Sequence, residues 1–335
     1  MTLKDIAKEA GVSIMTVSNV INGKDNRVSK STKKKITSII EKHNYIPNST
    51  ARSLSVKSSK IILVVLPYLE EGNVQNYYIT TFLSYIQNEI SKRNYFVMLY
   101  STNDYKEISF AASSWNVDGI IFLLSSVSSK ALAMDKFIKK PLVLMDYYSE
   151  EVKNKYLNVY VDDFKGGYTQ TKYLIDKGHE KIAFAGLKDN SLVLQQRFLG
   201  YEKAMEDNNI KTRKDMIYYC NIDFESGVKL GNALIKSIHK QSAIVCTSDL
   251  LALGIMESYR QKNLKLPQDL SIIGFDDLDL CKFVTPSLTS ISQNIRFKAQ
   301  ETVNLLIDNI ENISKNKVVK IDVNLVERES VYNLK

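Results

Sequence analysis

The sequence is poor in the residues that cross-link chains and bind metal ions. Its 335 residues include three cysteines and three histidines. Cys220, Cys246 and Cys281 are odd in number and lie far apart, without the paired spacing of a metal site. They predict buried free thiols, and we expect no disulfide framework, no metal ion and no other cofactor.

Patterns typical of catalytic and phosphate-binding sites are also missing. His43 and His239 are isolated, and His179 follows a glycine, where it is expected to close the end of a helix. Gly166 and Gly167 are adjacent, but neither Gly-x-x-x-x-Gly-Lys-Ser/Thr nor Gly-x-Gly-x-x-Gly occurs. No Ser/His/Asp or Cys/His arrangement stands out, and we do not expect an enzyme.

Long apolar runs are absent. No stretch of about 18 or more apolar residues occurs, which argues against a transmembrane helix. The first residues begin a predicted helix at once and show no signal-peptide pattern, so we expect a cytoplasmic protein. Apolar residues make up 44% of the chain, enough for sizeable cores, and the length of 335 residues indicates two or three domains.

Positive charge is concentrated at one end of the chain. Residues 1–60 hold 12 Lys or Arg and 4 Asp or Glu, whereas residues 61–335 hold 33 of each sign. The net charge of +8 therefore belongs to the first 60 residues. The lysine run at 33–35 alone fits an ordinary solvated surface, but a basic segment beside a neutral body is typical of a nucleic-acid-binding protein.

The residues 2–22 predict two short helices joined by a tight turn. Thr2 caps the first helix with Asp5 as its capping-box partner, Gly11 ends it, and Ser13 caps the second. This is the helix-turn-helix pattern, whose second helix enters the major groove of DNA, although an ordinary helical hairpin is the alternative. The outward face of the second helix carries Ile14, Met15, Ser18, Asn19 and Asn22.

A third helix and a short hinge follow this pair. The third helix is predicted from Ser29 to His43, with isoleucines inward and lysines outward. Residues 48–55, after Pro47, form a candidate helix that leads into a polar linker ending at Lys60. A helix of this length is marginal alone in water, so we expect it to order mainly on DNA.

The segments 2–22, Tyr45-Ile-Pro-Asn48 and Ala51-Arg-Ser-Leu54 together resemble the DNA-binding headpiece and hinge of the LacI/GalR family of bacterial repressors. In that family the hinge helix lies in the minor groove and a leucine, matched here by Leu54, wedges between central base pairs. Packing of Leu54 against the headpiece is the alternative. The resemblance implies DNA contacts at Thr2, Ser13, Ile14, Met15, Thr16, Ser18, Asn19, Asn22, Tyr45, Asn48, Ala51, Arg52, Leu54 and Ser55.

From Lys60 onward predicted strands and helices alternate. A continuous apolar strand at 61–66 opens one set of units, and the strand at 158–162 opens a second. This is the doubly wound α/β pattern, and two sets in tandem predict two lobes with a cleft between them. With the resemblance, the expected fold is a small all-α helix-turn-helix headpiece plus an α/β core of two doubly wound parallel-sheet lobes, similar to periplasmic binding proteins.

The expected domain boundaries follow from these patterns. Residues 1–46 form the headpiece, 47–60 the hinge helix and linker, and 61–335 an effector-binding and dimerisation core. The resemblance divides the core into a first lobe and a second lobe, the latter completed by a final strand at 318–331. The first lobe spans about 61–160 and 292–317, and the second about 161–291 and 318–335.

Short segments of the core also match the family, among them Thr247–Gly254, Pro267–Asp277 and Pro286–Gln293. Ligands of such lobes bind beyond the carboxyl ends of the strands, where carboxylates and a guanidinium can satisfy sugar hydroxyls and an aromatic ring can cover an apolar sugar face. Helix capping or an ion pair between the lobes is the alternative role for the polar residues. The resemblance implies effector contacts at Tyr78, Asp146, Arg197, Phe224, Ser248, Asp276 and Gln293.

The sequence departs from the family at its recognition helix and in its first lobe. Where relatives commonly carry arginine, this chain has Asn19, which favours adenine, while Ile14 and Met15 suit thymine methyl groups. We therefore predict DNA half-sites richer in A·T pairs than those of arginine-bearing relatives. The segment 68–78 differs from the family's usual short aromatic motif, and no leucine-heptad tail precedes Lys335, so we expect a homodimer on a palindromic operator.

These features predict a transcriptional repressor of carbohydrate-use genes that binds double-stranded DNA as a homodimer. A small-molecule effector, a sugar or sugar derivative in the cleft, would control it. Two alternatives stay open: a regulator controlled by a protein co-repressor, as in the catabolite-control branch of the family, and a solute-binding protein. The basic headpiece argues against the second alternative.

Overall fold

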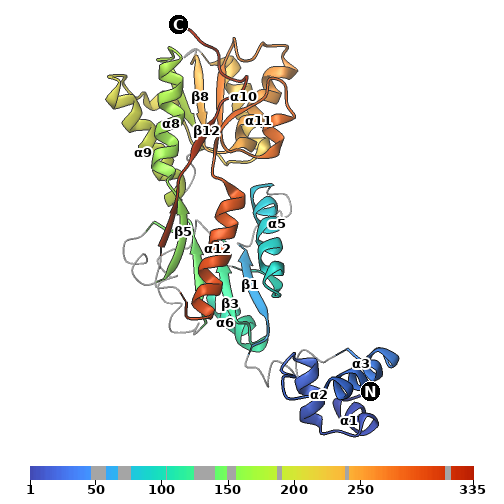
Figure 1. Cartoon of the computed structure of the whole chain (residues 1–335). Coiled ribbons are helices and arrows are strands. Elements are labelled where there is room, and N and C mark those ends of the chain that lie inside the picture. Colours follow the sequence, from blue (N-terminus) through green and yellow to red (C-terminus); the bar gives the residue numbers. More distant parts are fainter. Residues whose placement is uncertain are drawn as a thin grey trace. The chain divides into compact units, whose positions relative to one another are not determined.

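The chain divides into two compact units, Met1–Ser59 and Lys60–Lys335, in the computed structural model of Figure 1. The structure describes residues 1–46, 58–66, 77–102, 104–123, 140–148, 156–186, 191–237, 241–313 and 318–335. The predicted hinge helix, with Asn48, Ala51, Arg52, Leu54 and Ser55, lies outside the described residues.

The first unit is built from α1 (Leu3–Ala10), α2 (Ile14–Ile21) and α3 (Lys30–Lys42). The predicted capping box is confirmed, because the Thr2 hydroxyl accepts from the Asp5 backbone N–H while the Asp5 carboxylate accepts from the Thr2 backbone N–H at 2.8 Å. Gly11 ends α1 in the left-handed region, at φ +70°. The buried core of the unit comprises Ile6, Ala7, Ala10, Val17, Ile36 and Ile39.

The second unit contains two sheets, each the centre of one lobe. The first lobe holds a parallel sheet in the strand order β11-β5-β4-β3-β1-β2. Its helices are α5 (Tyr77–Lys92), α6 (Tyr105–Ser114) and α12 (Ile295–Ile310). Its strands are β1 (Ile61–Leu66), β2 (Phe96–Ser101), β3 (Gly119–Phe122), β4 (Leu142–Met145), β5 (Leu157–Val161) and β11 (Val318–Ile321).

The second lobe holds a sheet in the order β12-β10-β9-β8-β6-β7, in which β12 alone runs antiparallel to its neighbour. Its helices are α8 (Asp163–Asp176), α9 (Leu192–Asp207), α10 (Phe224–Lys236) and α11 (Asp249–Gln261), with short 3-10 turns at Lys214–Met216 and Asp279–Lys282. Its strands are β6 (Ile182–Ala185), β7 (Ile217–Tyr218), β8 (Ala243–Cys246), β9 (Ser271–Asp276), β10 (Thr289–Ser292) and β12 (Asn324–Val326).

Helices cover both faces of the second sheet, as the doubly wound pattern predicts. Figure 1 shows α8 and α9 on one side of β8, and α10 and α11 on the other. Alternate residues of β6 divide between two cores: Ile182 and Phe184 belong to the core that includes Tyr201 of α9, whereas Ala183 and Ala185 belong to the core that includes Leu230 of α10. The predicted fold class is therefore confirmed.

Two details of the predicted lobes are wrong. The strand expected to open the second set is β5, which pairs with β4 and belongs to the first sheet. The stretch 318–331 is not one strand that completes the second lobe: β11 pairs with β5 in the first sheet, and β12 pairs with β10 in the second. The chain crosses from one lobe to the other between β11 and β12, and pairing with strands distant in the sequence decides where each of the two belongs.

The three cysteines are free, as predicted, but Cys220 is only half-buried. His179 holds a structural position, since its ring nitrogens lie 2.9 Å from Ser242 Oγ and 3.0 Å from the Tyr332 carbonyl oxygen. Among the described helices, none is both long enough and apolar enough to span a membrane. Within the same part of the chain, no cluster of three His, Cys, Asp or Glu side chains is placed to hold a metal ion.

Candidate DNA-binding face and effector site

The second helix of the small unit presents an exposed surface that carries the predicted base-reading residues. Ser13 caps α2 by accepting from the Thr16 backbone N–H at 3.1 Å, so the first turn of α2 is fixed. Ile14 is 48% exposed and Met15 73%, on a helix whose Val17 is fully buried. Ile14 and Met15 are therefore accessible, as their predicted contact with thymine methyl groups requires.

Other predicted DNA contacts also have partners inside the unit. The Asn22 side-chain amide donates to the Ser18 carbonyl oxygen at 2.8 Å and to Ser18 Oγ at 3.2 Å, so these two side chains close the end of α2. Tyr45 is half-buried against the small core. Thr2 caps α1, so it too has a structural role. The DNA contacts assigned to these residues stay predictions, and Asn19 has no competing contact of this kind among the described residues.

In the large unit, polar side chains meet where strands of both sheets end. Asp146 follows β4 and Asp276 ends β9, and both have a positive φ, of 55° and 120°. Such backbone conformations are strained for residues other than glycine and are often found at functional sites. Parallel strands bring their carboxyl ends to one edge of a sheet, where α/β proteins bind ligands.

The Asp146 group is organised by Lys298, which the sequence interpretation did not include. The Lys298 ammonium donates to Asp146 Oδ2 at 2.6 Å, to the Tyr78 hydroxyl at 2.9 Å and to Gln293 Oε1 at 3.1 Å. The Gln293 amide in turn donates to Asp276 Oδ1 at 2.5 Å. Burial alone would lower the pKa of Lys298, but the Asp146 carboxylate and Tyr78 raise it above its ordinary value. Tyr78, Asp146, Gln293 and Asp276 are therefore brought together.

Arg197 forms a second buried group on the other side of Asp276. Its Nε donates to Asp163 Oδ1 at 2.7 Å, its Nη1 donates to the Thr247 carbonyl oxygen at 2.5 Å, and its guanidinium lies 3.5 Å from the Phe275 ring centroid. Burial would lower the pKa of Arg197, but Asp163, followed by Asp276, raises it. Burial also raises the pKa of Asp276, to about 8, against the opposing effect of Arg197.

Two glycines allow the helix contact that places Arg197. A Cβ on Gly167 would lie 2.0 Å from the Arg197 carbonyl oxygen, and a Cβ on Gly200 would lie 2.1 Å from the Phe164 carbonyl oxygen. Helices α8 and α9 therefore touch backbone to backbone, which holds Arg197 of α9 beside Asp163 at the start of α8. The glycine pair noted in the sequence has a packing role.

The remaining predicted effector residues are not part of these contacts. Ser248 caps α11: its Oγ accepts from the Leu251 backbone N–H at 3.2 Å and donates to the Ile222 carbonyl oxygen at 2.6 Å. Helix capping was the alternative role that the sequence analysis gave for these polar residues. Phe224 begins α10 and is 42% exposed. Both lie near the carboxyl ends of strands, and their effector roles stay predictions.

Three residues of the site were missed in the sequence. Besides Lys298, they are Asp163 and Tyr148, whose hydroxyl donates to the Asp163 carboxylate. Lys298 left a readable signal, because it lies one turn from Ile295 and Thr302 on the buried face of α12. A lysine on an apolar helix face needs a buried partner. The packing of α8 against α9 decides that Asp163 pairs with Arg197, and no local pattern in the sequence indicates this pair.

Asp249, next to the cap of α11, is a further buried carboxyl. It accepts from Ser290 Oγ at 2.6 Å and from the Leu278 backbone N–H at 2.8 Å, and burial raises its pKa to about 7. The carboxyl of an unfolded chain has a pKa of about 3.9. The folded state therefore holds the proton of Asp249 more tightly than the unfolded state does. The contribution of this group to the free energy of unfolding is complete below about pH 4 and is lost as pH rises through about 7.

Replacing Asp249 by asparagine is expected to flatten this pH dependence. An asparagine can still accept from Leu278 and can donate to Ser290, so the fold is retained. The free energy of unfolding, measured by urea titration, should fall less between pH 4 and pH 7 than in the wild type, with a difference on the order of a few kcal/mol. The exposed Asp279→Asn variant serves as control, and equal pH slopes in wild type and Asp249→Asn would contradict the assignment.

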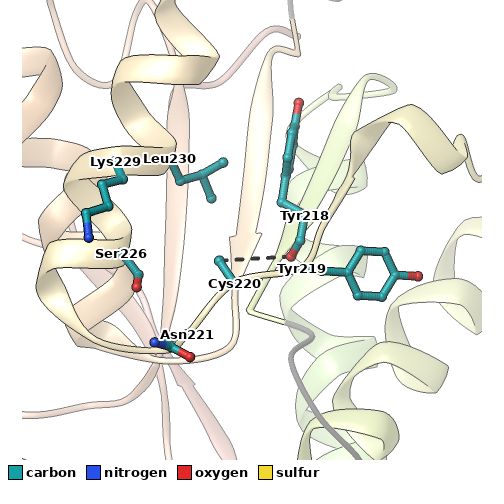
Figure 2. A pocket seen from close by; sticks show the side chains of 7 residues that line it. All are labelled: Tyr218, Tyr219, Cys220, Asn221, Ser226, Lys229 and Leu230. Carbon is teal, nitrogen blue, oxygen red and sulfur yellow. Dashed lines mark hydrogen bonds between the residues drawn. The ribbon is translucent and has the colours of Figure 1, made fainter.

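A pocket of about 400 Å³ lies beside β7 and the first turns of α10 (Figure 2). Burial raises the pKa of the Cys220 thiol in its wall, so this cysteine is not an activated nucleophile. Figure 2 shows the Tyr219 ring turned away from the other labelled side chains. The pocket contains none of the predicted effector residues, and its lining comprises Tyr218, Tyr219, Cys220, Asn221, Ser226, Lys229 and Leu230.

Comparison with known proteins covers both units of the chain. The family described as "Bacterial regulatory proteins, lacI family" matches residues 2–48, and the "Periplasmic binding protein-like domain" matches residues 171–331. The chain is 31% identical to the ribose operon repressor of Haemophilus influenzae over 339 residues, which covers 100% of this chain and 99% of that protein. It is also 31% identical to the repressor PurR of Haemophilus influenzae, over 99% of both chains.

The fold has a match among solved structures as well. The structure of the lac repressor dimer bound to operator and the anti-inducer ONPF aligns with a TM-score of 0.85 at 24% identity, covering 99% of both chains. At this identity the likeness shows a shared fold. The full-length matches to two repressors show the family.

Proposed function

This chain belongs to the LacI family of bacterial regulatory proteins, whose members are DNA-binding transcriptional repressors rather than enzymes, and on that premise we propose its specific role. It represses carbohydrate-use genes in the cytoplasm by binding a palindromic operator as a homodimer. A small-molecule effector, a sugar or sugar derivative bound between the lobes, controls it. A protein co-repressor is the second candidate for control.

The observation that carries the proposal for the effector is the buried polar cluster at the strand ends. It joins residues of α5, β4, β9 and α12 through hydrogen bonds of 2.5 to 3.4 Å. Buried polar groups in such numbers are costly unless they serve a ligand or a specific arrangement. The ribose operon repressor and PurR are similar to this chain over its full length, and the first name supports a sugar as effector.

The homodimer is supported by an edge strand of the first sheet. Strand β2 has a neighbour on one side, β1, among the described strands, and exposes Phe96 at 70% and Leu99 at 53%. An apolar edge left open to water favours association with another chain, and a two-fold axis would pair the same surface of two copies. The solved lac repressor of the same fold is a dimer.

Selection of bound duplexes from a random pool tests the DNA-binding part of the proposal. With full-length protein, we expect palindromic sites whose half-sites are richer in A·T pairs, because Asn19 favours adenine and the exposed Ile14 and Met15 suit thymine methyls. Half-sites dominated by G·C pairs would refute the base preference. Selected sites without two-fold symmetry would refute the homodimer on DNA.

A reporter assay with the selected sites tests the repressor role. A reporter placed behind a selected site should be expressed less when the protein is present, and the same reporter with a scrambled site should not respond. Higher expression from the selected site in the presence of protein would make the chain an activator and contradict the proposal.

A further inference from the structure

Lys298 is a fully buried lysine whose three ammonium protons all have partners in the effector cluster. It lies on the face of α12 that otherwise buries Ile295, Ala299 and Thr302. A buried ammonium is costly to place, and an apolar side chain would fill this position at lower cost. Its presence therefore points to a function in the cluster rather than to packing.

The carboxylate that Lys298 pairs with is only half satisfied. Asp146 Oδ2 accepts from Lys298 at 2.6 Å, whereas Asp146 Oδ1 is buried and has no hydrogen-bond partner in the described part of the chain. A buried acceptor without a donor costs free energy that a ligand O–H or N–H would recover. Asp146 thus offers Oδ1 to a ligand as an acceptor of fixed orientation, because Lys298 occupies the other oxygen, Oδ2.

Lys298 also orients Gln293. Because Gln293 Oε1 accepts from Lys298 at 3.1 Å, its amide nitrogen points to Asp276, to which it donates at 2.5 Å. The Tyr78 hydroxyl donates to the same Oε1 at 3.4 Å, so the ammonium strengthens this orientation of the amide. The buried cation therefore favours one direction of hydrogen bonding, with Asp146 and Gln293 accepting from Lys298 and the Gln293 amide donating to Asp276.

We infer that Lys298 is a positioning residue that makes the effector site selective for uncharged ligands rich in hydroxyl or amide N–H donors over phosphorylated ones. The inference rests on the proposed function, because it specifies the ligand class of the same site. Lys298 neutralises Asp146, and Arg197 is engaged by Asp163 at 2.7 Å, so both buried cations of the cluster already have a carboxylate partner. A phosphate would find no unpaired cation here and would lie beside carboxylates, an arrangement that disfavours binding.

Removing the charge of Asp146 tests this inference by a gain of binding. In full-length Asp146→Asn, the asparagine can still accept from Lys298, but the ammonium loses its counter-charge. We expect ribose 5-phosphate, and inorganic phosphate as the anion alone, to bind at least about tenfold more tightly than to the wild type in calorimetric titrations. Ribose should bind more weakly, because the acceptor Oδ1 becomes an amide donor or loses its charge.

A second variant shows whether Lys298 supplies the new attraction. Asp146→Asn with Lys298→Met keeps both volumes but removes the cation, and the gain in phosphate binding should disappear. A merely structural role of Lys298 would not produce a gain in the first variant that is lost in the second. No gain for phosphate ligands in a cooperatively folded Asp146→Asn protein would overturn the inference.

The wild type provides a comparison that does not depend on any variant folding. If it binds ribose 5-phosphate measurably and at least as tightly as ribose, the inference is wrong. If the wild type binds neither ribose nor ribose 5-phosphate but Asp146→Asn gains phosphate binding that the double variant loses, the selectivity inference stands and ribose is excluded as the effector of the proposed function.

Discussion

Arg197→Met is expected to lower the free energy of unfolding of the large unit by about 3–5 kcal/mol, as found when one partner of a buried ion pair is removed. The variant leaves the Asp163 carboxylate, which is fully buried, without its guanidinium partner, and it removes the donor to the Thr247 carbonyl oxygen. Urea unfolding followed by circular dichroism measures the loss. The same variant should abolish any rise in melting temperature that a sugar gives the wild type, since a ligand stabilises only the state that binds it.

Two controls distinguish the effect of breaking the buried ion pair from the effect of removing a positive charge in general. Arg213 pairs with Asp215 at the surface, so Arg213→Met removes the same chemical group where water screens the pair, and we expect no measurable change. Adding Asp163→Asn to Arg197→Met should recover part of the loss, because no buried charge is then left unpaired. A loss no larger than that of Arg213→Met would contradict the structural role of Arg197.

Ile36→Ala is expected to abolish specific DNA binding while leaving the large unit intact. Ile36 is fully buried in the small core, and truncating a buried isoleucine costs about 2–5 kcal/mol. A folded unit of this size has only a few kcal/mol of stability, roughly 0.05–0.15 kcal/mol per residue. Affinity for a selected operator, measured by fluorescence anisotropy, should fall by about a hundredfold or more.

The thermal unfolding of the large unit should not change in Ile36→Ala, because the two units have separate cores. Met15→Ala is the matched control, since Met15 is 73% exposed and its truncation leaves the small core untouched. It should keep the helical signal of the small unit and weaken operator binding by a smaller factor. If Ile36→Ala binds the operator as tightly as the wild type, the small unit is not the DNA-binding unit.

The headpiece was predictable from the sequence because its signals are local. The Thr2–Asp5 capping box, the left-handed Gly11 and the Ser13 cap each act within one helical turn. The same holds for the buried strands of the core, which are short apolar runs covered by helices on both faces. Residues within reach of one another along the chain therefore decided these elements, and the structure confirms them.

The effector cluster was predictable only in part. Tyr78, Asp146, Gln293 and Asp276 were predicted through the family resemblance and do meet, but Ser248 turned out to cap a helix. The segment 318–331 was predicted as one strand, but it holds two strands that belong to two sheets. In each case a local pattern was compatible with more than one role.

By itself, the sequence determined the helices of the headpiece and the buried strands of the core, that the positive charge belongs to the first 60 residues, and which family the chain resembles. Only the tertiary structure decided which polar groups pair. Lys298 meets Tyr78 across 220 residues of chain and Asp146 across 152, and Arg197 meets Asp163 because two glycines let their helices touch. The physical reason is that caps and apolar periodicity act over a few residues, whereas a buried charge is stabilised by whichever partner the packed chain brings within about 3 Å.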